Sequence, residues 1–157
     1  MKLKKSSRHA KITGDFCENI IRYWLSKYGF ECAIIDHTGI DIIARRLRSK
    51  EVIGISVKGR SRNVGKEGTP LSIDNDNFRK IKKACKAFKC KPYFALVIDA
   101  GEKIYCYILS LKHLLALQRK GKNTYSWHMK DKDIERYAKD RKIISFEFIY
   151  RTINWWE

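Results

Sequence analysis

Acidic residues are scarce in this chain. Its 157 residues hold 17 Asp and Glu against 34 Lys and Arg, which gives a formal net charge of +17. A charge of that size repels itself unless a polyanion neutralises it. DNA or RNA is therefore the first expected partner, and an anionic membrane surface is the second. A basic surface that serves only solubility is the remaining interpretation.

Long apolar runs are also missing. None approaches the ~20 residues that a membrane-spanning helix needs. The basic start of the chain is followed by no apolar stretch and no small-residue cleavage site, which argues against a secretory signal. We therefore expect a cytoplasmic protein that has nucleic acid, and not a membrane, as its partner.

The cysteines follow no binding pattern. There are five, an odd number, and no pair has CxxC spacing. Most lie among apolar residues, which indicates reduced core cysteines and not a disulfide framework. No cluster of Cys and His has metal-ligand spacing, so we expect no zinc site.

The chain divides into a short arm and one domain. Residues 1–13 are basic and are expected to form a flexible arm, which either lies along phosphates or serves only as a solubilising tail. The remaining length, residues 14–157, suits one domain with a buried core. The paired Trp155 and Trp156 near the end are expected to pack against the sheet.

The first helix is expected over residues 15–28. Apolar residues recur at a spacing of four from Ile20, Gly29 ends the helix, and Thr13 or Gly14 caps it. Three strands follow as an antiparallel meander, over residues 31–36, 41–46 and 52–59. The later elements are a helix over 74–89, a hairpin of strands over 93–99 and 103–110, short helices over 110–118 and 131–140, and a strand over 143–150. This order predicts an α/β fold in which helices flank a sheet.

Three polar residues hold distinctive positions in this pattern. Glu18 lies on the first helix, Asp41 opens the second strand in GIDIIA, and Lys58 ends the third strand in SVKGR. Ser56 precedes Lys58 by two residues and shares its face, because strand side chains alternate.

Residues 14–60 resemble the PD-(D/E)XK nuclease superfamily, which includes many restriction endonucleases and the archaeal-type Holliday junction resolvases. The likeness implies a restriction endonuclease-like core with a mixed central sheet, and a metal-dependent endonuclease that hydrolyses phosphodiester bonds, DNA favoured. It assigns Glu18 to the helix acid, Asp41 to the strand acid and Lys58 to the motif lysine. A homodimer is implied by the likeness alone.

Phosphodiester hydrolysis needs a nucleophilic water, neutralised charge on phosphorus and a stabilised leaving oxygen, and Mg²⁺ or Mn²⁺ supplies all three. Asp41 would be the central metal ligand. Glu18 would bind the metal directly or through water, and the backbone carbonyl of Val57 would add a ligand. Lys58 would orient the water, stabilise negative charge or act as a general base.

Ser56 departs from the superfamily, which has an acid at that position. The acid has migrated to Asp74 or Asp76, or Ser56 orders a water on the metal, or the site is degenerate and the domain only binds. Ordinary structural roles also exist for these residues. Glu18 has Arg22 as an i,i+4 partner, and Asp74 suits a helix cap.

Basic residues are expected to guide nucleic acid to this site. Those selected are Arg45, Arg46 and Arg48 in the hairpin after Asp41, Arg60, Arg62 and Lys66 after Lys58, and Arg79 and Lys83 on the second long helix. No RRM or KH signature accompanies them. Three functions follow: a metal-dependent nuclease, a binder with a decayed nuclease fold, or an interaction module that presents a basic face to acidic partners.

Overall fold

The computed structural model describes residues 4–153, so the expected packing of Trp155 and Trp156 falls outside the described residues. In chain order the elements are α1 (His9–Lys27), β1 (Phe30–His37), β2 (Ile40–Arg46), β3 (Val52–Ser61), β4 (Leu71–Asp74), α2 (Asp76–Ala87), β5 (Lys91–Asp99), β6 (Lys103–Ser110), α3 (Leu111–Leu117), β7 (Thr124–Trp127), α4 (Asp131–Lys139) and β8 (Ile144–Ile149).

Six of the strands form one mixed sheet in the order β1-β2-β3-β5-β6-β8. β3 and β5 pair in parallel, whereas the other neighbours pair antiparallel. A parallel pair needs a long crossover connection, and the segment that carries α2 provides it. The predicted α/β fold with a mixed central sheet is confirmed.

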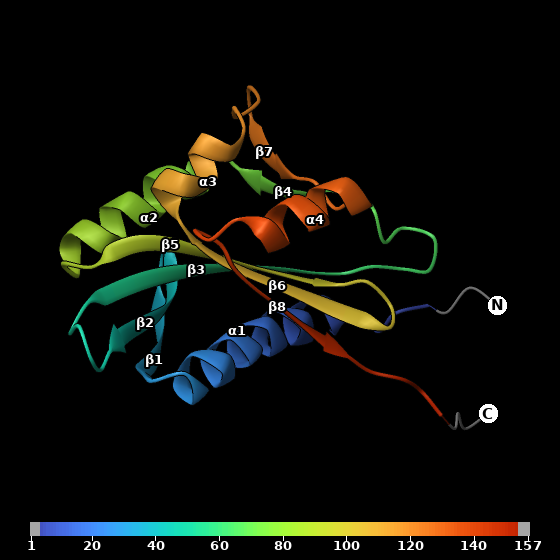
Figure 1. Ribbon diagram of the computed structural model, residues 1–157, viewed down its shortest axis with the longest axis horizontal. Coiled ribbons are helices and arrows are strands. Elements are labelled where there is room, and N and C mark those ends of the chain that lie inside the picture. Colours follow the sequence, from blue (N-terminus) through green and yellow to red (C-terminus); the bar gives the residue numbers. More distant parts are fainter. Residues whose placement is uncertain (1–3, 154–157) are drawn as a thin grey trace.

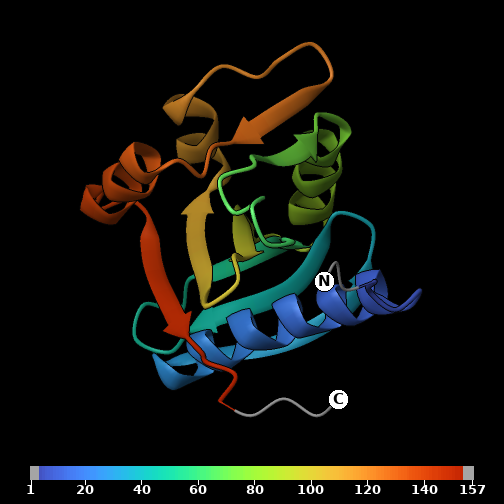
Figure 2. The ribbon, with the colours of Figure 1, turned by 90° about the vertical axis from the view of Figure 1, so that its right-hand side faces the viewer.

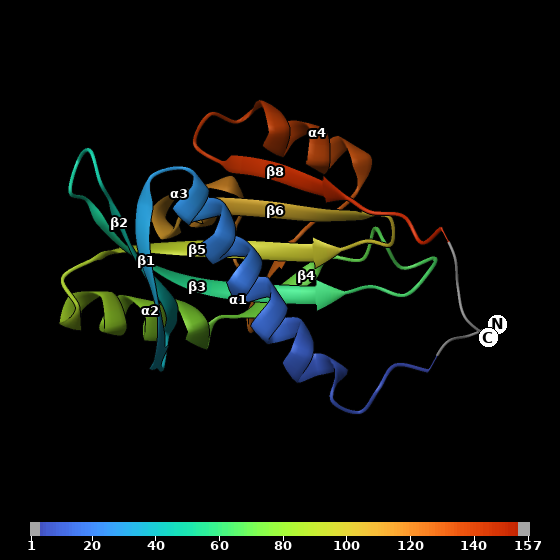
Figure 3. The ribbon, with the colours of Figure 1, turned by 90° about the horizontal axis from the view of Figure 1, so that it is seen from below.

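The two faces of the sheet are covered differently. α1 lies alone across one face, while α2, α3, α4 and the short β4–β7 pair lie on the other, as Figures 1 and 2 show. Figure 3 shows α1 crossing the sheet obliquely. Each face has its own apolar core, with Ile21 and Leu25 central on the α1 face and Phe78 and Ile81 on the α2 face.

The first helix begins earlier than the sequence suggested. α1 starts at His9, so residues 9–13, which we expected in the arm, are helical. Thr13 does not cap the helix, because its hydroxyl donates to the carbonyl of His9 at 2.7 Å within the helix. Gly14 has open space around it and does not interrupt the helix.

Two further features concern the cysteines and the apolar content of the helices. The five cysteines are free thiols, as expected, and three of them are buried. Within residues 4–153, no helix combines the length and apolar character needed to cross a membrane.

Candidate active site

The site begins where β2 and β3 separate. Their pairing runs from Arg45–Val52 to Ile42–Ile55 and ends there. Beyond it, the backbone N–H of Val57 donates to Oδ2 of Asp41 at 2.6 Å. The carboxylate therefore takes the place of a strand partner, which fixes its position at the open end of the pair.

The turn before Asp41 is held against α2. Gly39 has φ +107°, and a Cβ there would lie 2.6 Å from the backbone of Lys80. A positive φ and so close an approach both require glycine. This contact sets the direction in which the chain enters β2, and with it the direction of Asp41.

Ser56 and Lys58 accompany Asp41 on the α2 face of β3. Ser56 is buried, and its hydroxyl lies close enough to the Asp41 carboxylate to lower the pKa of that group. Lys58 is close enough for its charge to act on Asp41. Val57 packs into the core beneath α1, on the opposite face. The alternation expected from strand geometry therefore holds at this site.

Glu18 reaches the same place from α1. A Cβ on Gly59 would lie 2.3 Å from Sγ of Cys17, so α1 approaches β3 closely at this point. Arg22, the pairing partner that helix spacing offers Glu18, donates instead to Asn19 at 2.8 Å. Glu18 lies close enough to Asp41 for the charge of Asp41 to act on the Glu18 carboxyl.

The ionisation of all three groups is perturbed. Burial raises the pKa of Asp41, opposed by the Val57 N–H, by Lys58 and by the Ser56 hydroxyl. Burial also raises the pKa of Glu18, and the charge of Asp41 adds to the rise. Burial lowers the pKa of Lys58, opposed chiefly by Asp41. Clustered groups with such shifts are typical of functional sites.

Asp74 and Asp76 have different surroundings. Both are exposed, but Asp76 forms salt bridges with Lys80 at 2.9 Å and Arg79 at 2.7 Å, which lower its pKa. Asp74 ends β4, and its charge acts on Lys58. The N-cap residue of α2 is Asn75, with no side-chain hydrogen bond to the helix, so Asp74 does not have the capping role that the sequence allowed.

The donor set suits a hard divalent cation. Asp41, Glu18 and the Val57 carbonyl would offer oxygen ligands, which Mg²⁺ and Mn²⁺ prefer. The repulsion between Asp41 and Glu18 that raises the pKa of Glu18 is a charge imbalance that a cation would relieve. Across the described part of the chain, however, no three or more His, Cys, Asp or Glu side chains gather as a metal-binding group. The site therefore has fewer carboxylates than a complete cage.

Three predicted nucleic-acid contacts lie away from this site. Arg45 and Arg46 end β2 and Arg48 follows in the hairpin turn, at the opposite end of the strands from Asp41. Arg45 lies four positions after Asp41 along the strand, which is a distance of about 13 Å. Arg45 lies 3.9 Å from Glu31. The expectation that these arginines flank the site is corrected, because a strand carries its two ends in opposite directions.

The basic residues after Lys58 lie at the correct end. Arg60 is exposed, two residues beyond Lys58. Arg62 donates from Nη2 to the carbonyls of Thr69 and Pro70 at 2.9 and 2.7 Å, so part of its guanidinium holds the loop 62–70 in place. Lys66 lies exposed in that loop.

α2 contributes one lysine that the sequence did not single out. Arg79 is occupied by Asp76, and Lys83 is exposed. Lys80 also pairs with Asp76, yet its charge helps lower the pKa of Lys58. The signal for Lys80 was its i,i+4 spacing from Asp76, which places both on one helix face.

Comparison with known proteins adds one result. In sequence, no protein-family model and no curated protein matches the chain. In structure, it is similar to Hjc, a Holliday junction resolvase from the archaeal hyperthermophile Archaeoglobus fulgidus, with a TM-score of 0.55 and 18% identity over 73% of this chain and 83% of that one. The predicted mixed α/β fold, similar to that of an archaeal Holliday junction resolvase, is therefore confirmed.

Proposed function

We propose that this chain is a metal-dependent nuclease that hydrolyses phosphodiester bonds in nucleic acid, with DNA favoured. The observation that carries the proposal is the convergence of Asp41, Lys58 and Glu18 where β2 and β3 separate, with shifted pKa values in all three. The proposal includes a single nuclease-like domain over residues 14–157, extended by the first turns of α1, and a cytoplasmic location.

The division of labour follows from the surroundings of each group. Asp41, Glu18 and the Val57 carbonyl would hold Mg²⁺ or Mn²⁺, which supplies charge neutralisation and activation of water when bound. Ser56 and the Val57 N–H orient the Asp41 carboxylate. The lowered pKa of Lys58 makes its amine easier to deprotonate, which suits a group that orients water and exchanges a proton with it.

Asp74 is the residue we assign to the missing acid. Its charge acts on Lys58, it lies on β4 directly before α2, and it has no capping role. Asp76, which is exposed like Asp74, is held by two cations. Ser56 acts on the Asp41 carboxylate by lowering its pKa, which argues for a supporting role beside that group.

The test is cleavage of plasmid and branched DNA with Mg²⁺ or Mn²⁺. Asp41→Asn and Asp74→Asn should both abolish cleavage, and Asp76→Asn, the matched control, should retain it. Cleavage that survives Asp74→Asn would remove Asp74 from the site and leave a site of two carboxylates. DNA binding with the metal chelated should persist in all three variants, which separates lost chemistry from lost binding.

A second function is favoured by the shortage of carboxylates. With no larger metal-binding group among the described residues, the domain would bind nucleic acid without cutting it. No cleavage by the native protein, nor by a Ser56→Glu variant with Mn²⁺, would establish this alternative. The homodimer stays a prediction, and sedimentation of the native protein tests it.

A further inference from the structure

The first described residues fold back onto the end of β3. Nζ of Lys5 donates to the carbonyl of Ser61 at 2.7 Å and to its hydroxyl at 3.1 Å. That hydroxyl donates in turn to Oδ2 of Asp99 at 3.1 Å, and the hydroxyl of Tyr150 donates to Oδ1 at 2.8 Å. The segment before α1 is therefore anchored by a network that joins β3, β5 and the residue directly after β8.

This anchoring creates a hollow of about 340 Å³ between the segment, the first turns of α1 and the end of β3. Lys5, Ser7, His9 and Arg60 are among the side chains that line it, and no carboxylate among the described residues does so. Asp99, the nearest acid of the network, accepts hydrogen bonds on both oxygens and belongs to a neighbouring hollow.

The hollow has hydrogen-bond donors to spare. An ammonium group has three N–H donors, and Lys5 uses two of them on Ser61. Nη1 of Arg60 donates to the carbonyl of the adjacent Gly59 at 2.9 Å, which leaves most N–H donors of the guanidinium available. Nε2 of His9 is buried and meets no hydrogen-bond partner within residues 4–153. Donors and cations facing one small space favour an oxyanion.

The start of α1 adds to this preference. The helix has 19 residues, no acidic residue in its first turn and no side-chain cap. The N–H groups of Arg8 and His9 at this end already donate to Ser6, but among the described residues the positive end of the helix dipole meets no carboxylate at the wall of the hollow.

We propose that this hollow binds a backbone phosphate of the nucleic acid beside the scissile one. The proposal rests on the proposed function and adds to it a second contact point. Arg60 lies two strand residues beyond Lys58, about 7 Å along β3. Thr13, on the wall, precedes Glu18 by five residues, about 7.5 Å along α1. Because each strand of a duplex rises about 3.4 Å per nucleotide along the axis and its phosphate path is longer than that rise, both counts place the second phosphate one or two nucleotides away.

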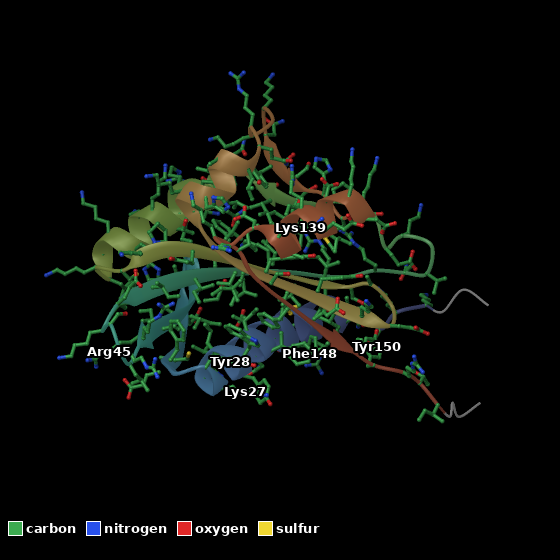
Figure 4. All side chains as sticks on the ribbon, in the orientation of Figure 1. Lys27, Tyr28, Arg45, Lys139, Phe148 and Tyr150 are labelled. Atoms are coloured by element: carbon green, nitrogen blue, oxygen red, sulfur yellow. The ribbon has the colours of Figure 1, made fainter. Side chains whose placement is uncertain are left out.

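The first test compares two lysines of α1 and its preceding segment. Lys27 lies at the far end of α1, beside Tyr28. Lys5 belongs to the anchoring network, and Tyr150 of that network is labelled together with Lys27 in Figure 4. Binding of a fluorescent duplex is measured by anisotropy across a range of salt concentrations, with the metal chelated. Lys5→Ala should reduce the slope of log affinity against log salt by about 0.9, and Lys27→Ala should change it less. Circular dichroism confirms folding of both variants.

The second test locates the phosphate. Duplexes that each carry one neutral methylphosphonate linkage are scanned for affinity. With native protein, one linkage position should weaken binding more than its neighbours, and the same substitution should have no further effect on Lys5→Ala. Losses that simply add at every position, or equal slope changes for Lys5→Ala and Lys27→Ala, would overturn the subsite. Because these readouts need no cleavage, an inactive but binding native protein would contradict the nuclease and leave the subsite intact.

Discussion

The two ends of the β2–β3 pair show how one strand pair serves two purposes. At the hairpin end, backbone pairing continues through Arg45–Val52, and apolar side chains such as Ala44 and Ile53 are buried. At the other end, pairing stops after Ile42–Ile55, and a carboxylate accepts the N–H that a backbone carbonyl would otherwise take.

This difference separates stability from chemistry. Burial of Ile53 contributes to folding at little electrostatic cost. Asp41, Glu18 and Lys58 instead carry charges that burial disfavours, and their pKa values shift accordingly. Groups that are costly to bury persist where function requires them, and the paired end of the strands compensates for that cost.

Asp41→Asn should have the largest effect on activity. The amide is a poor metal ligand, so cleavage should fall below detection. Because burial raises the pKa of Asp41, the neutral amide should also stabilise the fold at neutral pH, with the melting temperature rising by about 2–4 °C for each kcal/mol gained. Melting curves in a chelating buffer measure this rise. A marked fall in melting temperature would show that the Val57 contact outweighs the cost of the buried charge.

Ile53→Ala should produce the opposite pattern. Truncating this buried side chain at the paired end should cost about 2–5 kcal/mol of unfolding free energy. Urea denaturation gives the change directly. Cleavage per folded molecule should be nearly unchanged below the melting transition, and a loss of activity as large as that of Asp41→Asn would mean that the two ends are not separate.

Arg60→Ala and Arg45→Ala sharpen the comparison for binding. Arg60 lies beside the site, so its loss should reduce the salt dependence of duplex binding by about one phosphate contact. Arg45, near Glu31 at the far end, should reduce it less. Equal slopes, measured by anisotropy, would indicate that nucleic acid contacts both ends of the strand pair.

Ser56→Ala should have the smallest effect. The hydroxyl offers Asp41 at most one neutral hydrogen bond, so its removal should cost about 1 kcal/mol, or less than tenfold in cleavage rate. Single-turnover cleavage is the measurement, with Ser56→Thr as the variant that keeps the hydroxyl. A loss of several hundredfold, restored by Thr, would give Ser56 a direct role in the reaction.

The sequence predicted the strand positions of Asp41 and Lys58 because both are fixed by short-range rules. Glycine before Asp41 marks a turn, and the period of two sets the face of Lys58. The prediction that Arg45 lies beside the site was wrong, although the length of the strand was enough to correct it. A seven-residue strand spans about 23 Å, so one strand cannot hold both Asp41 and Arg45 at one site.

Other features needed contacts that a sequence does not display. β4 and β7 are four residues each and pair across Leu71–Trp127, too short for a period and too distant in the chain to anticipate. Thr13 is equally suited to cap a helix or to bond within one, and only the fold decides between them. The hollow beside Lys5 depends on Ser61 and Asp99, from two strands that are not neighbours in sequence.

The tight contact between Cys17 and Gly59 also provides a way to measure the motion of α1 against the sheet. Burial, with the charges of Asp99 and Glu18, raises the pKa of the Cys17 thiol to about 12. A thiol that is both enclosed and protonated does not react with alkylating reagents. Labelling of Cys17 therefore requires α1 to lift from the sheet, and its rate measures how often that opening occurs. The same opening would carry Glu18 away from Asp41. The rate of Cys17 alkylation would therefore also measure how often the candidate site comes apart.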